Sequence, residues 1–209
     1  MIYKDIFTAN TSFNEDRVAV YIPTDATFAQ VQELVKPYVE DMERFNMVAE
    51  KKSYNSNVKA GKFILKKGMN SNDIINSLRQ PVAVNIAFNN QETLQRTVGR
   101  IAQQIEPDSL ELLKVFTDKA FLEENGFTED NVLSIFIPNT YEFFWNTKAE
   151  KVRDKMAKEY RNFWTPERVA KAEALNLTPL EVSSLAAIVH KETVKTDERP
   201  RVAGVYLNR

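Results

Sequence analysis

The spacing of apolar residues changes along the chain, and this change constrains the fold more than any other feature. In the first 80 residues, period-two segments typical of strands alternate with segments of helical period. From Pro107 onward, most apolar segments have helical spacing. We therefore expect an α+β fold in which a small mixed module is followed by a helix-rich module, with the boundary near Gln80 and Pro81.

The first module is predicted to have β-α-α-β-α order. Arg17–Ile22 and Lys62–Lys67 have strand patterns. The first helix should start after Thr27, which has the spacing of a capping box with Gln30. A second helix should follow or start at the Pro37 break, and a third should be capped by Ser71. This organisation predicts an N-terminal extension over residues 1–16, a compact module over 17–80 and a helix-rich module over 81–209.

The helix-rich module should open with one more strand, a turn and a helix. Val82–Phe88 reads as the strand, Asn89 and Asn90 as the turn, and Thr93–Ile105 as the helix. An extended apolar segment at 132–145 interrupts the helices that follow. The other segments of helical period are 108–116, 118–126 with Gly126 at its end, 148–164, 165–175, 178–189 and the C-terminal segment.

One of these helices places a carboxylate on its apolar side. With Thr178 as cap, Pro179 first and Glu181 at the capping-box position, the register is fixed, and Glu192 falls over Leu185. A carboxyl group held against apolar side chains has a raised pKa, as a general acid near neutral pH requires. Two other interpretations remain: Glu192 lies at a solvated helix end, or Lys195 or Arg199 pairs with it.

Composition excludes several other classes of site. The 28 basic and 29 acidic residues leave a net charge of -1, so charge alone would not recruit nucleic acid or an anionic membrane. There is no cysteine and a single histidine, His190, which does not favour a metal site. No serine has the context of a nucleophile elbow, and no glycine-rich phosphate loop occurs. We therefore expect neither a metal nor a cofactor.

An aromatic cluster lies within the extended segment. Tyr141, Phe143, Phe144 and Trp145 follow one another closely. Aromatic rings can stack on sugar rings, but in a mixed apolar segment they also commonly form core. Both interpretations remain open from the sequence.

The C-terminal segment LAAIVHKETVKTDERPRVAGVYLNR resembles the signature of the YceG-like, MltG-type family of endolytic murein transglycosylases. Earlier segments agree in order: VYIPTDATFAQVQELV, KAGKFILKKGMNSNDIINSL and FIPNTYEF each resemble a family segment. The resemblance extends from Val18 to Arg209. It implies a LysM-like fold for residues 17–80 and a YceG-like catalytic domain for residues 81–209 that lacks the C-terminal part of its pocket.

The resemblance also implies roles for single residues. The glutamate of the KET motif, Glu192, would be the catalytic residue. The remaining matches would contact substrate, with Arg199 and Asn208 as candidates for orienting Glu192 or holding the glycan. These candidate substrate-binding residues are Asn139, Tyr141, Glu198, Arg199, Tyr206, Asn208 and Arg209.

The implied function is cleavage of the bond between N-acetylmuramic acid and N-acetylglucosamine in peptidoglycan, giving 1,6-anhydro ends. One carboxylate suffices for this reaction, whereas most glycoside hydrolases use two. Family members carry one N-terminal membrane helix, which is not visible in this sequence, and face the periplasm or the cell exterior. We therefore expect a place in the cell envelope, with peptidoglycan strands and cell-wall synthesis proteins as partners.

Two other functions stay open. The chain could be a non-catalytic module that binds peptidoglycan and anchors a partner protein. Proteins resembling the family have also been labelled aminodeoxychorismate lyases, a chemistry that normally uses a pyridoxal phosphate lysine. No phosphate-binding segment accompanies such a lysine here.

Overall fold

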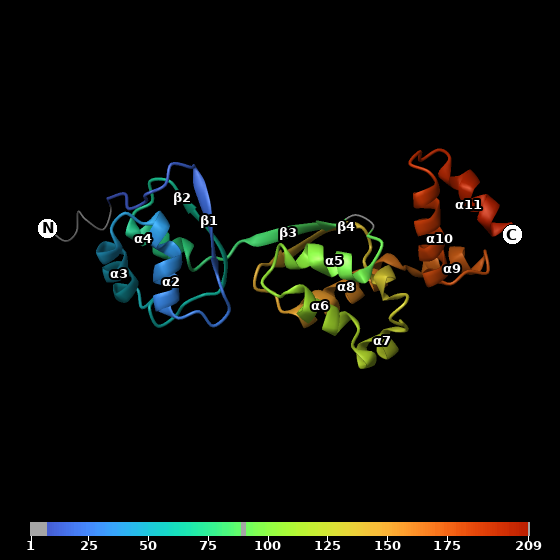
Figure 1. Cartoon of the computed structure of the whole chain (residues 1–209), viewed down its shortest axis with the longest axis horizontal. Coiled ribbons are helices and arrows are strands. Elements are labelled where there is room, and N and C mark those ends of the chain that lie inside the picture. Colours follow the sequence, from blue (N-terminus) through green and yellow to red (C-terminus); the bar gives the residue numbers. More distant parts are fainter. Residues whose placement is uncertain (1–7, 89–90, 209) are drawn as a thin grey trace. The chain divides into compact units, whose positions relative to one another are not determined.

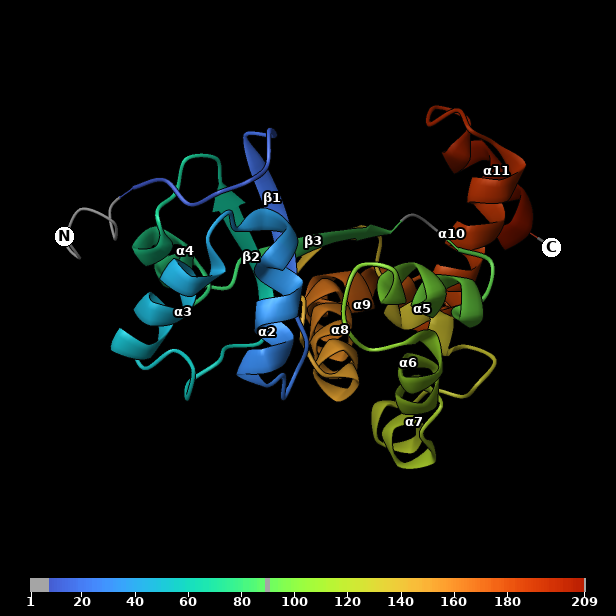
Figure 2. The ribbon, with the colours of Figure 1, turned by 60° about the vertical axis from the view of Figure 1, so that its left-hand side comes forward.

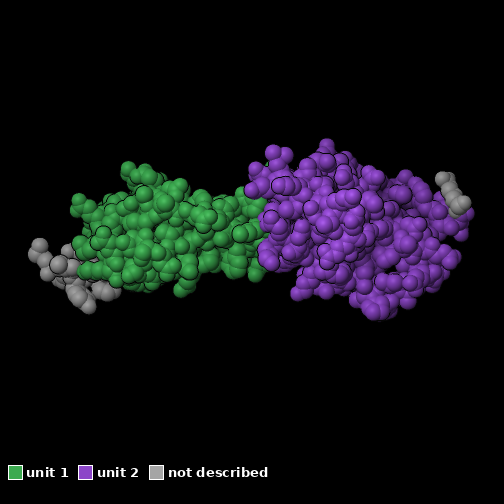
Figure 3. All heavy atoms as spheres, turned by 90° about the horizontal axis from the view of Figure 1, so that it is seen from below, with its two compact units in different colours: residues 1–86, 103–107, 141–148 green, residues 87–102, 108–140, 149–209 purple. Residues whose placement is uncertain are grey.

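A computed structural model describes residues 8–88 and 91–208, and it has the mixed α+β content expected from the sequence. The chain divides into two compact units, coloured separately in Figure 3. The first unit runs to Ile86 and also includes residues 103–107 and 141–148. The second comprises Ala87–Ala102, Asp108–Thr140 and the chain from Ala149 onward. Neither unit is a single continuous segment.

The first unit is built on two antiparallel strands, β1 and β2, as Figure 1 shows. Val20 of β1 pairs with Phe63 of β2, and alternate residues on both strands are buried. The two strands therefore present one apolar face, which three helices complete together with a 3-10 turn. The elements are β1 (Arg17–Ile22), α2 (Phe28–Val35), η1 (Lys36–Tyr38), α3 (Met42–Lys51), β2 (Gly61–Lys66) and α4 (Ser71–Ser77).

Helix starts in this unit follow the predicted capping chemistry with one correction. Thr27 and Gln30 form the predicted capping box of α2. The predicted cap Ser71 is wrong, because Asn70 caps α4 and accepts the backbone N–H of Asp73 at 2.9 Å. Ser71 is instead buried in the first turn, where its hydroxyl oxygen accepts a hydrogen bond from Asn10 Nδ2 at 2.8 Å.

Asn10 connects the beginning of the chain to the first unit. Its side chain is fully buried, and its amide donates to the carbonyl of Asp41 at 2.9 Å and accepts the N–H of Asp41 at 2.7 Å. Its backbone N–H donates to the carbonyl of Met69 at 2.8 Å. Residues 9–12 are thus held by backbone and side-chain bonds within the predicted N-terminal extension.

Pro37 separates two helices, one of the outcomes predicted from the sequence. It lies in η1, and the chain is extended at Val39 before α3 starts. Asp41 caps α3 by accepting the N–H of Arg44 at 2.9 Å.

A second two-stranded sheet and a group of helices follow. The pairs α5 and α6, α6 and α8, and η2 and α8 pack together. Phe116 and Phe136 lie within this group, with ring centroids 4.7 Å apart. The elements are β3 (Ala83–Phe88), α5 (Leu94–Ala102), α6 (Ser109–Phe116), α7 (Lys119–Asn125), η2 (Val132–Ile135), β4 (Asn139–Phe144) and α8 (Ala149–Phe163).

The helices of this region begin and end close to the predicted residues, except that α5 ends at Ala102 and not at Ile105. Gly126 ends α7 in the left-handed conformation with φ of 73°, as its position predicted. The strand β3 pairs with β4. The predicted turn residues Asn89 and Asn90 lie outside the described residues.

The last described segment contains three helices, α9 (Pro166–Glu173), α10 (Pro179–Glu192) and α11 (Arg199–Leu207). Thr165 and Thr178 cap α9 and α10, and a proline follows each cap, as predicted. In Figures 1 and 2, α10 and α11 lie side by side. Lys191 and Glu192 of the KET motif end α10, and Tyr206 lies on α11.

Across residues 8–88 and 91–208, none of the helices combines the length and apolar character needed to cross a bilayer.

Candidate active site

Glu192 is the last residue of α10, and it lies beside the packed side of the helix instead of on it. The packed side is centred on Val189, the buried residue of α10, and Thr193, just past the helix end, is also buried. Glu192 is displaced from Val189 by about 60° around the helix, at roughly 100° per residue. The carboxylate therefore stands at the border between packed residues and an open surface.

The interpretation that Glu192 is held against apolar side chains is wrong, and the alternative of a solvated helix end is the one observed. Its side chain is exposed, and Ile188, one turn earlier, is 41% exposed. The reason is that α10 packs mainly against α9, α11 and η2, and Val189 is the residue of the helix that becomes buried. The apolar stripe inferred from spacing is wider than the surface that its neighbours can cover.

Helix α11 supplies the partner of Glu192. The hydroxyl of Tyr206 donates a hydrogen bond to Glu192 Oε1 at 3.0 Å. The two residues are 14 positions apart, and the turn between α10 and α11 brings them together. A hydrogen bond of this length fixes one carboxylate oxygen and leaves the other available to a ligand.

The turn between the two helices is closed by Thr193 and Glu198. The Thr193 hydroxyl donates to Glu198 Oε2 at 2.8 Å and accepts the N–H of Lys195 at 3.1 Å. Lys195 Nζ lies 3.2 Å from Glu198 Oε1. Lys195 therefore pairs with Glu198, and the alternative in which it neutralises Glu192 is not observed.

A pocket of about 620 Å³ opens at this end of α10. This is within the size range of small-molecule sites in proteins. Apolar and polar groups both line it, so it could accept a ligand with apolar faces and hydroxyl groups. The lining residues are Gln91, Glu92, Leu133, Ala187, Ile188, His190, Lys191 and Glu192.

An ion pair joins two sides of the pocket. Lys191 Nζ bonds to Glu92 Oε1, and Arg96 lies 3.1 Å from the other oxygen of Glu92. The hydrogen bond and charge of Lys191, and then the charge of Arg96, hold the pKa of Glu92 below its usual range. Lys191 is thus engaged by Glu92, directly beside Glu192 in the sequence.

The model of the YceG-like family matches residues 20–209. The chain belongs to the YceG-like family.

Two curated relatives are both named endolytic murein transglycosylase, from Streptococcus pneumoniae strains D39 and R6. They are 24% and 25% identical to this chain over 194 and 195 residues. Each alignment covers 79% of this chain and 35% of the relative, so the chain spans about a third of their length.

A crystal structure of a YceG-like protein from Listeria monocytogenes has a similar fold, with a TM-score of 0.53 and 18% sequence identity. The match covers 89% of this chain and 67% of that one. At this identity the likeness concerns the fold alone.

The YceG-like motif residues do not all gather at the pocket. Tyr206 contacts Glu192, and Glu198 closes the turn between the helices. Arg199 starts α11 half-buried, with its Nε enclosed and without a hydrogen-bond partner among the described residues. Asn208 is exposed at the end of α11, and Arg209 lies outside the described residues.

The earlier motif residues lie on β4. Asn139 is exposed, and its Oδ1 accepts the N–H of Thr140 at 2.8 Å. Tyr141 is only 4% exposed and belongs to the first unit. A buried ring cannot stack on a sugar, so the structure favours the core interpretation for Tyr141.

The remaining aromatic residues of the cluster alternate as a strand requires. Phe143 is buried and Phe144 is 52% exposed. Trp145 packs against Tyr21, with ring centroids 5.3 Å apart. Within the cluster, Phe144 is therefore the ring open to a ligand.

Several pocket residues had no signal in the sequence. Glu92 is 99 positions from Lys191, and Leu133 lies in a 3-10 turn that the sequence suggested only as an extended segment. His190 and Lys191 also line the pocket beside Glu192. The KET motif and the helix register set by Thr178 both pointed to Glu192, and through it to this site.

The described residues contain no group of three or more histidine or carboxylate side chains placed to hold a metal ion.

Proposed function

We propose that this chain is the transglycosylase part of an envelope protein that cleaves peptidoglycan strands internally, with Glu192 as the catalytic residue. The observation that carries the proposal is the position of Glu192 at the rim of a pocket, held by Tyr206, within a family match over residues 20–209. The names of the two curated relatives support peptidoglycan as the substrate and the cell envelope as the location.

In the proposed reaction, the protonated Glu192 gives its proton to the oxygen between N-acetylmuramic acid and N-acetylglucosamine. The C1–O bond of the muramoyl residue breaks, and its own 6-hydroxyl oxygen forms a new bond to C1. Glu192, now a carboxylate, takes the proton of that hydroxyl. The products are a 1,6-anhydro end and a free 4-hydroxyl, and no second carboxylate is needed.

Because Glu192 is exposed, its protonated form would have to be stabilised by the bound substrate and not by the protein alone. The sequence suggested that the protein itself buries the carboxyl group, but the side chain is exposed. A glycan lying on Leu133, Ala187 and Ile188 would displace water from the pocket. The carboxyl group would then lose its surrounding water only when the substrate binds. Its protonated form would be favoured at the moment when the sugar linkage lies beside it.

The first unit would serve as a LysM-like, glycan-associated module. The order β1-α2-α3-β2, with antiparallel β1 and β2, supports this assignment. We assign it residues 17–80, with residues 1–16 before it and the catalytic module after it. In this proposal Arg199, at the start of α11, and Asn208, just after its end, would orient Glu192 or hold the glycan.

The test replaces Glu192 with glutamine, which keeps shape and removes the acid. Glu192→Gln should reduce release of anhydromuropeptides from purified sacculi by at least about 10²-fold, the usual range for general acid–base catalysis. Products are measured by mass spectrometry. Glu173→Gln, an exposed glutamate on α9, is the matched control and should retain activity.

Undiminished product from Glu192→Gln would contradict the proposed role. Binding of the unaltered chain to sacculi with no soluble product would instead support a non-catalytic anchoring module. An absorbance band of pyridoxal phosphate in the purified protein would support the lyase chemistry.

A further inference from the structure

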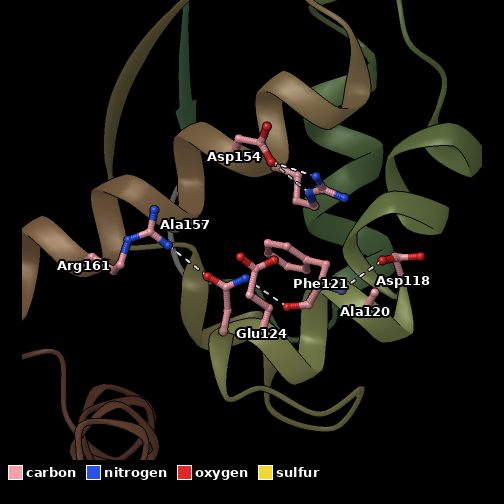
Figure 4. A pocket seen from close by; sticks show the side chains of 9 residues that line it. Asp118, Ala120, Phe121, Glu124, Asp154, Ala157 and Arg161 are labelled. Carbon is pink, nitrogen blue, oxygen red and sulfur yellow. Dashed lines mark hydrogen bonds and ion pairs between the residues drawn. The ribbon is translucent and has the colours of Figure 1, made fainter.

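A second pocket, of about 360 Å³, lies between α7 and α8 in the second unit. Figure 4 shows it from close by. Its lining shares no residue with the Glu192 pocket. Charged side chains dominate it: Asp118 and Glu124 come from α7 or its cap, and Arg153, Asp154 and Arg161 come from α8.

The inner part of this pocket is fixed by contacts within the protein. The Arg153 guanidinium lies over the ring of Phe121, 4.6 Å from its centroid. Its Nε and Nη2 donate to Asp154 Oδ1 at 3.1 and 2.8 Å. Arg153 and Asp154 are therefore satisfied by each other, and the buried Phe121 ring forms an apolar base beneath them.

The outer part carries two charges that the protein does not neutralise. Arg161 Nη1 donates to Asn125 Oδ1 at 2.9 Å, and the amide is oriented because Asn125 Nδ2 donates to the Phe121 carbonyl at 2.9 Å. Asn125 is neutral, and among the described residues no carboxylate forms an ion pair with Arg161. Glu124, the neighbour of Asn125, likewise has no ion-pair partner in the described part of the chain.

A ligand that suits this pocket must carry both charges. A carboxylate can bind the remaining N–H groups of Arg161, and an ammonium group can bind Glu124. A phosphate dianion would be repelled by Asp118 and Glu124, and a purely apolar ligand would leave the charges desolvated. The pocket chemistry is therefore that of a zwitterion.

The length of the pocket along α8 suits a short peptide. Arg153 and Arg161 both line the pocket and are eight residues apart on α8, which corresponds to about 12 Å along the helix axis. An extended peptide spans about 3.4 Å per residue, so three or four residues would cover this length.

We propose that the α7–α8 pocket binds the short peptide attached to a peptidoglycan strand, with a peptide carboxylate at Arg161 and an ammonium group at Glu124. The choice of this peptide as the ligand rests on the proposed function of the chain. The pocket would hold the substrate through its peptide, separately from the glycan held at Glu192.

The probe is the tripeptide N-acetyl-alanyl-glutamyl-lysine, which presents one lysine carboxylate and one lysine ammonium group at its end. Binding is measured by calorimetry and by NMR shifts of the α7 and α8 amides. We expect saturable binding, weakened roughly tenfold or more by Arg161→Gln and by Glu124→Gln, because each removes one charge-assisted hydrogen bond. Converting the lysine carboxylate to an amide should weaken binding to a similar extent.

Two matched variants keep the test specific. Lys158→Gln and Glu150→Gln remove one positive and one negative charge from exposed positions of α8 outside the pocket, and both should bind the tripeptide as the unaltered chain does. Glu192→Gln should also bind it unchanged, because Glu192 lies in the other pocket. A protein that binds the tripeptide but releases no anhydromuropeptides would keep this inference and contradict the proposed catalysis.

Equal binding by Arg161→Gln and Lys158→Gln would overturn the proposal, as would the absence of saturable binding at millimolar tripeptide. NMR shifts confined to the residues around Glu192 would also overturn the proposal, since the tripeptide would then bind at the pocket proposed for the glycan.

Discussion

Helices α2, α3 and α4 of the first unit and helices α9, α10 and α11 are packed very differently. Around β1 and β2, a single cluster includes buried residues from every helix of the unit. In α9–α11, the buried side chains among the described residues are Ala172, Val189 and Thr193. The proposed catalytic residue lies in the sparsely packed segment.

This difference separates stability from function within one chain. A densely packed core resists change, whereas helices with few buried contacts open more easily and leave polar groups accessible. Glu192 is accessible because α10 buries little of its surface, with Val189 as its buried residue. We therefore expect the first unit to tolerate core changes poorly and α10 to tolerate them better.

The largest expected difference comes from the same substitution in the two regions. Val20 in β1 is 2% exposed and Val189 in α10 is 7% exposed. Val20→Ala should lower the free energy of unfolding of its unit by about 2–3 kcal/mol, from lost apolar burial and a residual cavity. Val189→Ala should cost about 1 kcal/mol or less, because fewer neighbours surround it and alanine has the higher helix propensity.

Urea unfolding followed by tryptophan fluorescence separates the two units, because Trp145 belongs to the first and Trp164 to the second. The fluorescence of each tryptophan is measured by itself in a variant whose other tryptophan is changed to phenylalanine. If Val189→Ala destabilises its unit as much as Val20→Ala does, the comparison between the two regions is wrong.

A smaller effect is expected where the two regions are alike. Both α2 and α10 start with a complete capping box, formed by Thr27 with Gln30 and by Thr178 with Glu181. Thr27→Ala and Thr178→Ala should each cost about 1 kcal/mol, because a cap acts on its own helix turn and not through the core. Circular dichroism during urea unfolding measures both, and Thr→Ser at each position is the control that keeps the hydroxyl. If one Thr→Ala change lowers the free energy of unfolding and the other does not, the contribution of a cap would depend on how its helix is packed.

Local features of this fold could be predicted because their causes are local. The capping boxes, the Pro37 break and the Gly126 helix end depend on residues within a few positions of one another. Strand β1 was predicted with its observed limits because alternation is visible in six residues. The identity of the α4 cap was missed, since Asn70 and Ser71 are adjacent and equally suitable, and only the buried contact of Ser71 with Asn10 distinguishes them.

The site was predicted less completely because its geometry is not local. Periodicity ranks the faces of α10 but does not tell how many neighbours will cover them. The sequence therefore placed Glu192 on the apolar stripe and could not decide between burial there and a solvated helix end. The motif match supplied Tyr206 as a candidate, and the structure adds its bond to Glu192. Glu92 could not be inferred, because its partner Lys191 is 99 positions away.

The Glu92–Lys191 pair offers the smallest test, since it joins α10 to the chain before α5. Glu92→Lys or Lys191→Glu alone should speed hydrogen exchange of the last α10 amides roughly twofold, because exposed ion pairs contribute little. The double exchange Glu92→Lys with Lys191→Glu should restore the original rates. Exchanging the exposed pair Glu167 and Lys171 on α9 is the control and should leave the α10 amides unchanged.

The same pair should respond to pH in a defined direction. Lys191 is the main cause of the lowered pKa of Glu92, so its contribution is fully present above the ordinary carboxyl pKa of about 4.3 and is lost as pH falls through the lowered value. In Lys191→Gln, an NMR titration should show the Glu92 pKa moving back up toward the ordinary value. The pKa of Glu181, lowered by hydrogen bonds from Thr178, should not change in that variant. A Glu92 titration unaffected by Lys191→Gln would mean that the pair does not persist in solution, and α10 would then be held by its narrow packed side alone.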